Sequence, residues 1–250
     1  GGGMSALVAA MTGTSLWAVD GAAFREIVTQ SAIGSAWVVR MAAVAIALLA
    51  ALALGRSPHL ARYCLLASAV LAIATLVWTG HAGATEGRTG SLHRLSDIVH
   101  MLAAAVWIGG IAAFSWLLFQ PLAHQSDAQI RIAHRALEQF SRVGTLAVGL
   151  IVLTGIINSL SLMGLPHPYA LFASRYGQLL LIKLALFAAM LVLAGANRWR
   201  LTPALGAANG NPVPALRGLR QSLVLETSTV LTILAVVAWL GTLEPIMANG

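Results

Sequence analysis

The chain has 250 residues, of which 58% are hydrophobic and only 9% are charged. Soluble domains run at roughly a quarter charged residues, so this composition, with a mean hydropathy of +0.83, excludes an ordinary soluble protein. The formal net charge of +7 comes from arginines in short loops between apolar segments. This placement indicates membrane topology and argues against nucleic-acid binding. The lone cysteine, Cys64, excludes an internal disulfide and a CxxC site, and we interpret it as a small apolar helix residue.

The N-terminal end is expected to hold only a partial membrane segment. Residues 4–19 are apolar but are interrupted by threonine, glycine and serine at 12–15. No cleavable signal peptide of the usual form is visible, and we expect residues 1–3, which precede Met4, to be an expression remnant. Residues 20–35 carry charges and are predicted to be a connection that does not span the membrane.

Six later stretches are long and apolar enough to cross a hydrocarbon layer of roughly 30 Å as helices. In chain order the predicted spans are 36–54, 63–79, 95–119, 143–163, 176–196 and 222–243. These runs are too long for the short alternating strands of a membrane barrel. We therefore predict an all-α, polytopic transmembrane helical bundle in lipid, with about six full spans and a partial N-terminal segment. It forms one domain over residues 4–245.

The arginines predict the orientation of the chain. Most of them fall in alternate loops, as a consistent topology requires, and the positive-inside rule places these loops in the cytoplasm. These loops are 55–62, 120–142 and 197–220, and the middle one is expected to be helical from 122. The outward loops are then 20–35, 80–94 and 164–175. His81 and His93 are therefore predicted at the outer, periplasm-like face.

The third span begins with a line of ionisable residues, and such residues inside a membrane are costly and often functional. His93, Asp97 and His100 are spaced i, i+4 and i+7, which places them on one helical face. At about 1.5 Å of rise per residue, His93 and His100 lie roughly 10 Å apart along the axis. We therefore expect a ladder of sites completed by other helices rather than one compact site. His81, which ends the preceding span, is the candidate partner.

Imidazole is a suitable ligand for copper, zinc, iron and nickel. A ligating histidine usually has its second nitrogen held by a carboxylate or a carbonyl, and Asp97 lies one turn from His93. The simpler interpretation is a set of interfacial histidines beside an aspartate at a helix start, where the helix dipole favours it. The remaining histidines are expected to be solvated in loops: His59, His124, His134 and His167.

Other polar residues fall in or beside the spans, namely Asn158, Lys183, Asn197 and Glu226. Glu226 has no charged neighbour in its own helix, and we expect it to pair with Asn197 or Arg198 on another helix. Met101 and Met190 are candidate soft ligands for Cu(I), although scattered methionines in apolar helices are typical of packing. No nucleophile elbow, phosphate loop, HExxH motif or carboxylate pair is present, so no enzyme activity is predicted.

The sequence resembles the CopD family of bacterial copper-resistance membrane proteins over roughly residues 25–245. The strongest part of the resemblance is Gly80-His81-Ala82, then the helix from His93 to His100, then Trp107-Ile108-Gly109-Gly110. Further matching segments are 140–142, 154–158, 176–183, 196–198 and 225–226. Family members usually have further spans at the N-terminal end, so this chain is expected to be a shortened member or a fragment.

The resemblance implies an inner-membrane protein that handles copper and moves it inward across the membrane. It implies a partner as well, a periplasmic copper chaperone of the CopC type. The metal role passes only to His81, His93 and His100.

Two alternatives remain open. One is a b-type haem electron carrier, in which His81 and His100 on different helices would ligate the haem, although their predicted depths differ. The other is an accessory subunit that does not transport copper and only receives it from a partner.

Overall fold

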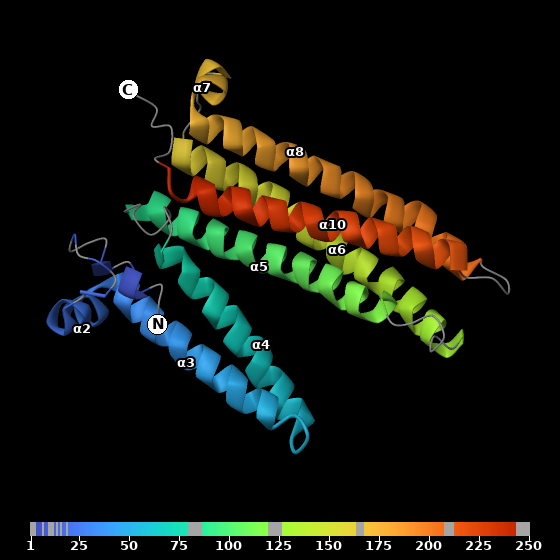
Figure 1. Ribbon diagram of the computed structural model, residues 1–250, viewed down its shortest axis with the longest axis horizontal. Helices are drawn as coiled ribbons and strands as arrows, with labels where there is room; N and C mark the ends of the chain where they lie inside the picture. The colour runs from blue at the N-terminus through green and yellow to red at the C-terminus, as the bar shows by residue number, and fades with distance from the viewer. Residues whose placement is uncertain are drawn as a thin grey trace. The chain divides into compact units, whose positions relative to one another are not determined.

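The computed structural model describes residues 4–6, 8–9, 13, 15, 17–18, 20–79, 87–119, 127–163, 168–207 and 213–243. Within these ranges every regular element is a helix (Figure 1). Six helical stretches are long and apolar enough to cross a membrane. The all-α, polytopic fold predicted from the sequence is therefore confirmed.

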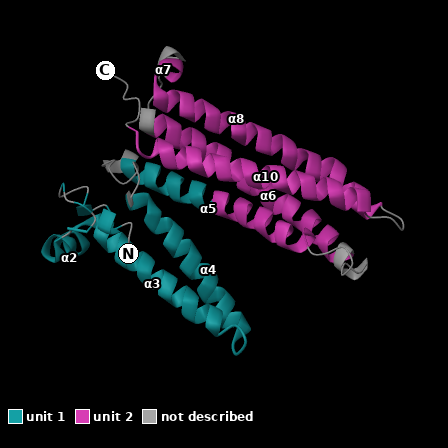
Figure 2. Cartoon of the chain, viewed as in Figure 1, with its two compact units in different colours: residues 1–102 teal, residues 103–250 magenta. Residues whose placement is uncertain are grey.

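The chain divides into two compact units, residues 1–102 and 103–250 (Figure 2). Unit 1 holds α2 (Gly21–Gln30), α3 (Ala32–Leu52), α4 (Pro58–Ala74), the 3-10 helix η1 (Thr75–Thr79) and the first half of α5 (Gly87–Leu118). Unit 2 holds the second half of α5, α6 (Asp127–Met163), α7 (Pro168–Ala173), α8 (Arg175–Ala196), the π-helical segment η4 (Asn197–Leu201), α9 (Thr202–Gly206) and α10 (Val213–Leu240). The single domain predicted over residues 4–245 stays a prediction.

Unit 1 begins with a tight helix-to-helix bend at Ser31. The Ser31 hydroxyl accepts a hydrogen bond from the Gly34 amide at 2.9 Å, which caps the start of α3. The same hydroxyl donates to the Ile27 carbonyl at 2.7 Å, near the end of α2. A side chain at position 34 would collide with the backbone of Ile27 and Val28. The bend therefore needs a glycine three residues after the cap.

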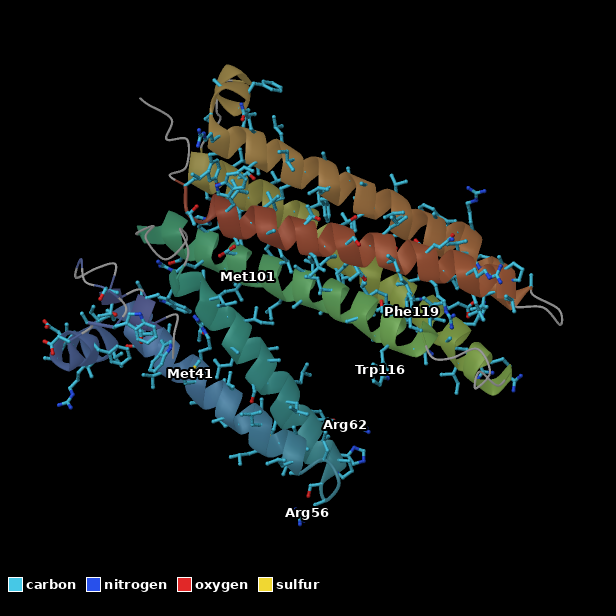
Figure 3. All side chains as sticks on the ribbon, in the orientation of Figure 1. Met41, Arg56, Arg62, Met101, Trp116 and Phe119 are labelled. Carbon is cyan, nitrogen blue, oxygen red and sulfur yellow. The ribbon has the colours of Figure 1, made fainter. Side chains whose placement is uncertain are left out.

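Helices α3 and α4 form an antiparallel hairpin (Figure 1). Turn residues follow Leu52, and Pro58 begins α4, where its fixed φ and missing amide proton suit the first helical turn. Arg56 and Arg62 lie at this end of the hairpin (Figure 3). These two arginines belong to the loop that the sequence predicts on the cytoplasmic side.

The core of unit 2 lies among the second half of α5, α6, α8, α9 and α10. At Gly110 of α5, the ring of Phe140 from α6 occupies the space that a side chain would fill. Phe140 also meets Phe114 edge-on, with ring centroids 5.2 Å apart. A small residue at 110 therefore lets α5 and α6 pack directly, as small residues do in membrane bundles.

All six predicted spans are confirmed, but most of the helices run on into polar sequence. Helix α5 begins at Gly87, α6 at Asp127 and α10 at Val213, whereas the predicted spans begin at 95, 143 and 222. Helix α8 continues through η4 and α9 to Gly206, so the predicted loop 197–220 is largely helical. An apolar pattern marks only the part of a helix inside hydrocarbon, whereas backbone hydrogen bonding continues into the aqueous ends.

Exposed tryptophans lie near the helix ends of unit 2. Trp116 is 79% exposed close to the end of α5 (Figure 3), and Trp199 is 73% exposed in η4. Trp239 is 56% exposed at the end of α10, which runs in the opposite direction to α8 (Figure 1). Tryptophan is enriched at the two membrane–water interfaces, so we expect these side chains to lie at the level of the lipid headgroups.

Candidate functional site

The first half of α5 carries the predicted ladder of ionisable residues. His93, Asp97 and His100 all lie on this one continuous helix, so their spacing places them on one face, as predicted. His93 is only 4% exposed, while Asp97 and His100 are half-buried. Ser96, beside them, is also buried at 5% exposure. This end of α5 therefore holds two buried polar side chains, His93 and Ser96, beside the half-buried Asp97 and His100.

The third residue of the predicted copper set, His81, lies outside the described residues. Among the residues that the structure describes, no group of three His, Cys, Asp or Glu side chains is arranged to hold a metal ion. The roles of His81, His93 and His100 therefore remain predictions.

A second polar site lies in unit 2, at Glu226 in α10. Glu226 is 4% exposed, and Ser222, one turn earlier, is 6% exposed. The side-chain amide nitrogen of Asn197 donates a hydrogen bond to Glu226 Oε1. Of the two partners predicted for Glu226, Asn197 and Arg198, the structure thus selects Asn197.

Arg198 has a different role. Its Nη1 donates to the Ser141 carbonyl of α6 at 3.3 Å and also to the Thr145 hydroxyl. Asn197 and Arg198 open the π-helical segment η4, and consecutive residues of this segment therefore bind two different helices. Short π segments inside α-helices often occur at functional sites.

Arg40, which lies inside α3, was not among the predicted functional residues. Its guanidinium donates from Nε to the Thr75 hydroxyl at 3.0 Å and from Nη2 to the Thr75 carbonyl at 2.8 Å. Thr75 is the residue at which α4 changes into the 3-10 helix η1, and it is 5% exposed. The only sequence signal was an arginine within an apolar run, which is costly in a membrane unless it has partners.

The remaining candidates are structural where the structure describes them. Met190 is 5% exposed in the core of unit 2, so its prediction as a packing residue is confirmed. Cys64 is half-buried in α4 with a free thiol. His59 is exposed as predicted.

His134 was predicted to be solvated, but it is half-buried, lies against Gly206 and has its Nδ1 3.7 Å from Glu138 Oε2. His124 and His167 lie outside the described residues.

Six apolar helices that also hold buried polar and ionisable side chains define a multi-pass helical membrane protein. Two family models match the chain: residues 134–240 match copper resistance protein D, and residues 1–91 match the N-terminal domain of copper resistance protein D-like proteins. The chain belongs to the copper resistance protein D family, which confirms the resemblance inferred from its motifs.

Curated relatives support this assignment. The chain is 37% identical over 243 residues to copper resistance protein D of Pseudomonas syringae pv. tomato, covering 96% of this chain and 78% of the relative. It is 30% identical over 224 residues to inner membrane protein YebZ of Escherichia coli K12, covering 88% and 71%. It is 31% identical over 182 residues to copper transport protein CutJ of Bacillus subtilis 168, covering 71% of this chain and 32% of that relative. No solved structure matches the chain.

Proposed function

We propose that this chain handles copper in a bacterial inner membrane, and that His81, His93 and His100 take copper from the periplasmic face into the helical bundle. The names of its relatives as copper resistance and copper transport proteins support the choice of metal. The observation that carries the histidine assignment is the burial of His93, at 4% exposure, on the same helix face as Asp97 and His100.

The chemistry of these side chains agrees with copper as cargo. Neutral imidazole binds copper in both common oxidation states. Asp97, one turn from His93, is suited to hold the second ring nitrogen and so to orient the ligating one. We also propose that a periplasmic chaperone of the CopC type delivers the copper, and that the chain carries out no catalysis.

Copper stoichiometry of the purified protein tests this proposal. The variants are His81→Ala, His93→Ala and His100→Ala, singly and combined, and the matched control is His59→Ala, an exposed histidine on the predicted cytoplasmic side. We expect the combined variant to lose copper and the control to retain it. Unchanged copper in the combined variant, with normal folding by circular dichroism, would overturn the assignment.

Two further measurements separate the alternatives. An absorption spectrum that shows a Soret band in the purified protein would favour a haem carrier over a copper protein. Copper uptake into vesicles that contain this chain alone would exclude a purely accessory role. Uptake only after a periplasmic chaperone is added would favour delivery by a partner.

A further inference from the structure

Glu226 has no part in the proposed copper site, although it is a buried acid of unit 2. It lies near the middle of α10, which runs from Val213 to Leu240, and its side chain is 4% exposed. A carboxylate that is removed from water and has no cation beside it is strongly destabilising. The residues around Glu226 therefore indicate whether a cationic side chain, a metal ion or a proton neutralises its carboxylate.

No described cation neutralises Glu226 through an ion pair. The elements that share a core with α10 are α8, η4, α9, α6 and the second half of α5, and this half of α5 carries no charged residue. In η4, the Arg198 guanidinium is bound to α6, and Arg200 is exposed. Lys183 in α8 precedes Asn197 by fourteen residues, which is about 21 Å along a helix axis.

The other charged groups around this end of α10 are also directed elsewhere. Within α10, Arg217 is exposed, and Arg220 donates from Nε to the Leu118 carbonyl at 2.7 Å. On α6, His134 and Glu138 pair within that helix, and Arg131, Arg135 and Arg142 are exposed. The described residues thus surround the Glu226 carboxyl group with neutral partners.

These neutral partners provide hydrogen-bonding groups rather than positive charge. Asn197 uses its amide nitrogen on Glu226, and its Oδ1 is buried without a hydrogen-bond partner in the described part of the chain. Ser222 adds one hydroxyl on the same face of α10. A hard metal ion commonly takes about six oxygen ligands, more than these three side chains supply. A proton needs only the carboxylate itself.

An asparagine is suited to both protonation states of a carboxyl group. Its amide nitrogen donates to the ionised form, and its carbonyl accepts from the protonated form after the amide turns over. The unused Oδ1 of Asn197 is therefore the acceptor that a protonated Glu226 requires. The position of Asn197 at the start of the π-helical segment η4, a wider turn than an α-helix, leaves its side chain beside α10.

We propose that Glu226 and Asn197 form a proton-binding site in unit 2, in which Glu226 takes up and releases one proton while the protein stays folded. The proton adds to a carboxylate oxygen of Glu226 and leaves from the same oxygen, and the Asn197 amide reorients to follow it. A link between this proton and the movement of copper rests on the proposed function, whereas the proton site itself does not.

Infrared difference spectra of the full chain in lipid nanodiscs, recorded between acidic and alkaline buffer, test the site. We expect a component of the carbonyl band of protonated carboxyl groups to appear on acidification in the native protein and to be missing from that band in Glu226→Gln. Glu138→Gln, which removes a 60% exposed acid, is the matched control and should retain the band. Asn197→Ala should shift the frequency of the band, because the hydrogen-bond partner is lost.

Two results would overturn the proposal. One is a native spectrum identical to that of Glu226→Gln, and the other is a Glu226 band that stays constant over the whole pH range in which the protein is folded. Should Glu226→Gln not fold, Asn197→Ala decides, since an unshifted band in that variant contradicts the site. Copper stoichiometry of the histidine variants is read independently of this band, so failure of the copper assignment and failure of the proton site are distinguishable.

Discussion

Arg40 of α3 binds both the hydroxyl and the carbonyl group of Thr75, at 3.0 and 2.8 Å, and so joins the middle of one helix to the end of the next. The carbonyl belongs to the residue where α4 gives way to the 3-10 helix η1. Two donors of a single guanidinium therefore stabilise the change of helix type at Thr75, where the buried backbone has little water to hydrate it.

Replacement of Arg40 should destabilise unit 1. Hydrogen bonds to charged groups contribute about 2 kcal/mol, so we expect Arg40→Ala to lower the free energy of unfolding by about that amount and Arg40→Lys by less. Thermal unfolding in detergent measures the change. Arg56→Ala removes an exposed arginine from the turn between α3 and α4 and should have little effect. Equal stability of Arg40→Ala and Arg56→Ala would contradict the role given to Arg40.

The two serine caps of unit 1 offer a matched pair. Ser31 caps α3 through its side chain, whereas Ser57 precedes α4 without a side-chain capping bond. We expect Ser31→Ala to cost about 1 kcal/mol of stability and Ser57→Ala to cost much less. Denaturant or thermal unfolding of both variants checks the difference. Unchanged stability of Ser31→Ala would show that the bend at Ser31 does not depend on its hydroxyl.

The adjacent glycines of α5 should respond in opposite ways to the same substitution. A methyl group at 110 would collide with the Phe140 ring, whereas at 109 it would meet nothing within 4 Å. Gly110→Ala should therefore destabilise unit 2 by about 1–3 kcal/mol, as overpacking does. Gly109→Ala should be neutral or slightly stabilising, because alanine favours helices by roughly 0.5–1 kcal/mol over glycine. Unfolding temperatures that fall equally in both variants would contradict the close packing of α5 on α6.

Copper occupancy should decrease stepwise along the ladder. Because His93 and His100 lie about 10 Å apart along the helix, we do not expect them to share one ion. Each single alanine variant should then lose part of the bound copper, and the double variant should lose more. Metal analysis after equilibrium dialysis gives the stoichiometry, with His59→Ala as the control. Complete loss of copper in either single variant would show instead that both histidines serve one site.

The sequence was sufficient to predict the spans because a helix must be apolar over a long run to cross lipid, and each such run can be recognised without reference to the rest of the chain. It was insufficient for the helix ends in the predicted loop 197–220, where η4, α9 and the start of α10 form helix without an apolar pattern. The polar helix before residue 143 was predicted, and it is confirmed from Asp127 onward. The pairing of Glu226 with another helix was predictable because a buried acid needs a donor. Asn197 rather than Arg198 bonds Glu226, and it does so from the π-helical segment η4, which no sequence motif predicted.

Two of the three predicted copper ligands, His93 and His100, lie among the described residues. The shared face of His93, Asp97 and His100 follows directly from helical spacing and is present in the structure. The contact of Arg40 was not predicted because its partner, Thr75, is uncharged and lies 35 residues away. Neither residue belongs to a sequence motif that would indicate the pair.

The exposed tryptophans at both ends of unit 2 have a consequence for the lipid. Trp116 and Trp199 are expected at one headgroup layer and Trp239 at the other. In a bilayer of unsuitable thickness, the helices must tilt or one set of indole rings must leave its layer, at a cost of fractions of a kcal/mol per Å. Acyl-chain length is therefore an environmental variable to which the helix tilt, and with it the buried polar contacts of unit 2, should be sensitive.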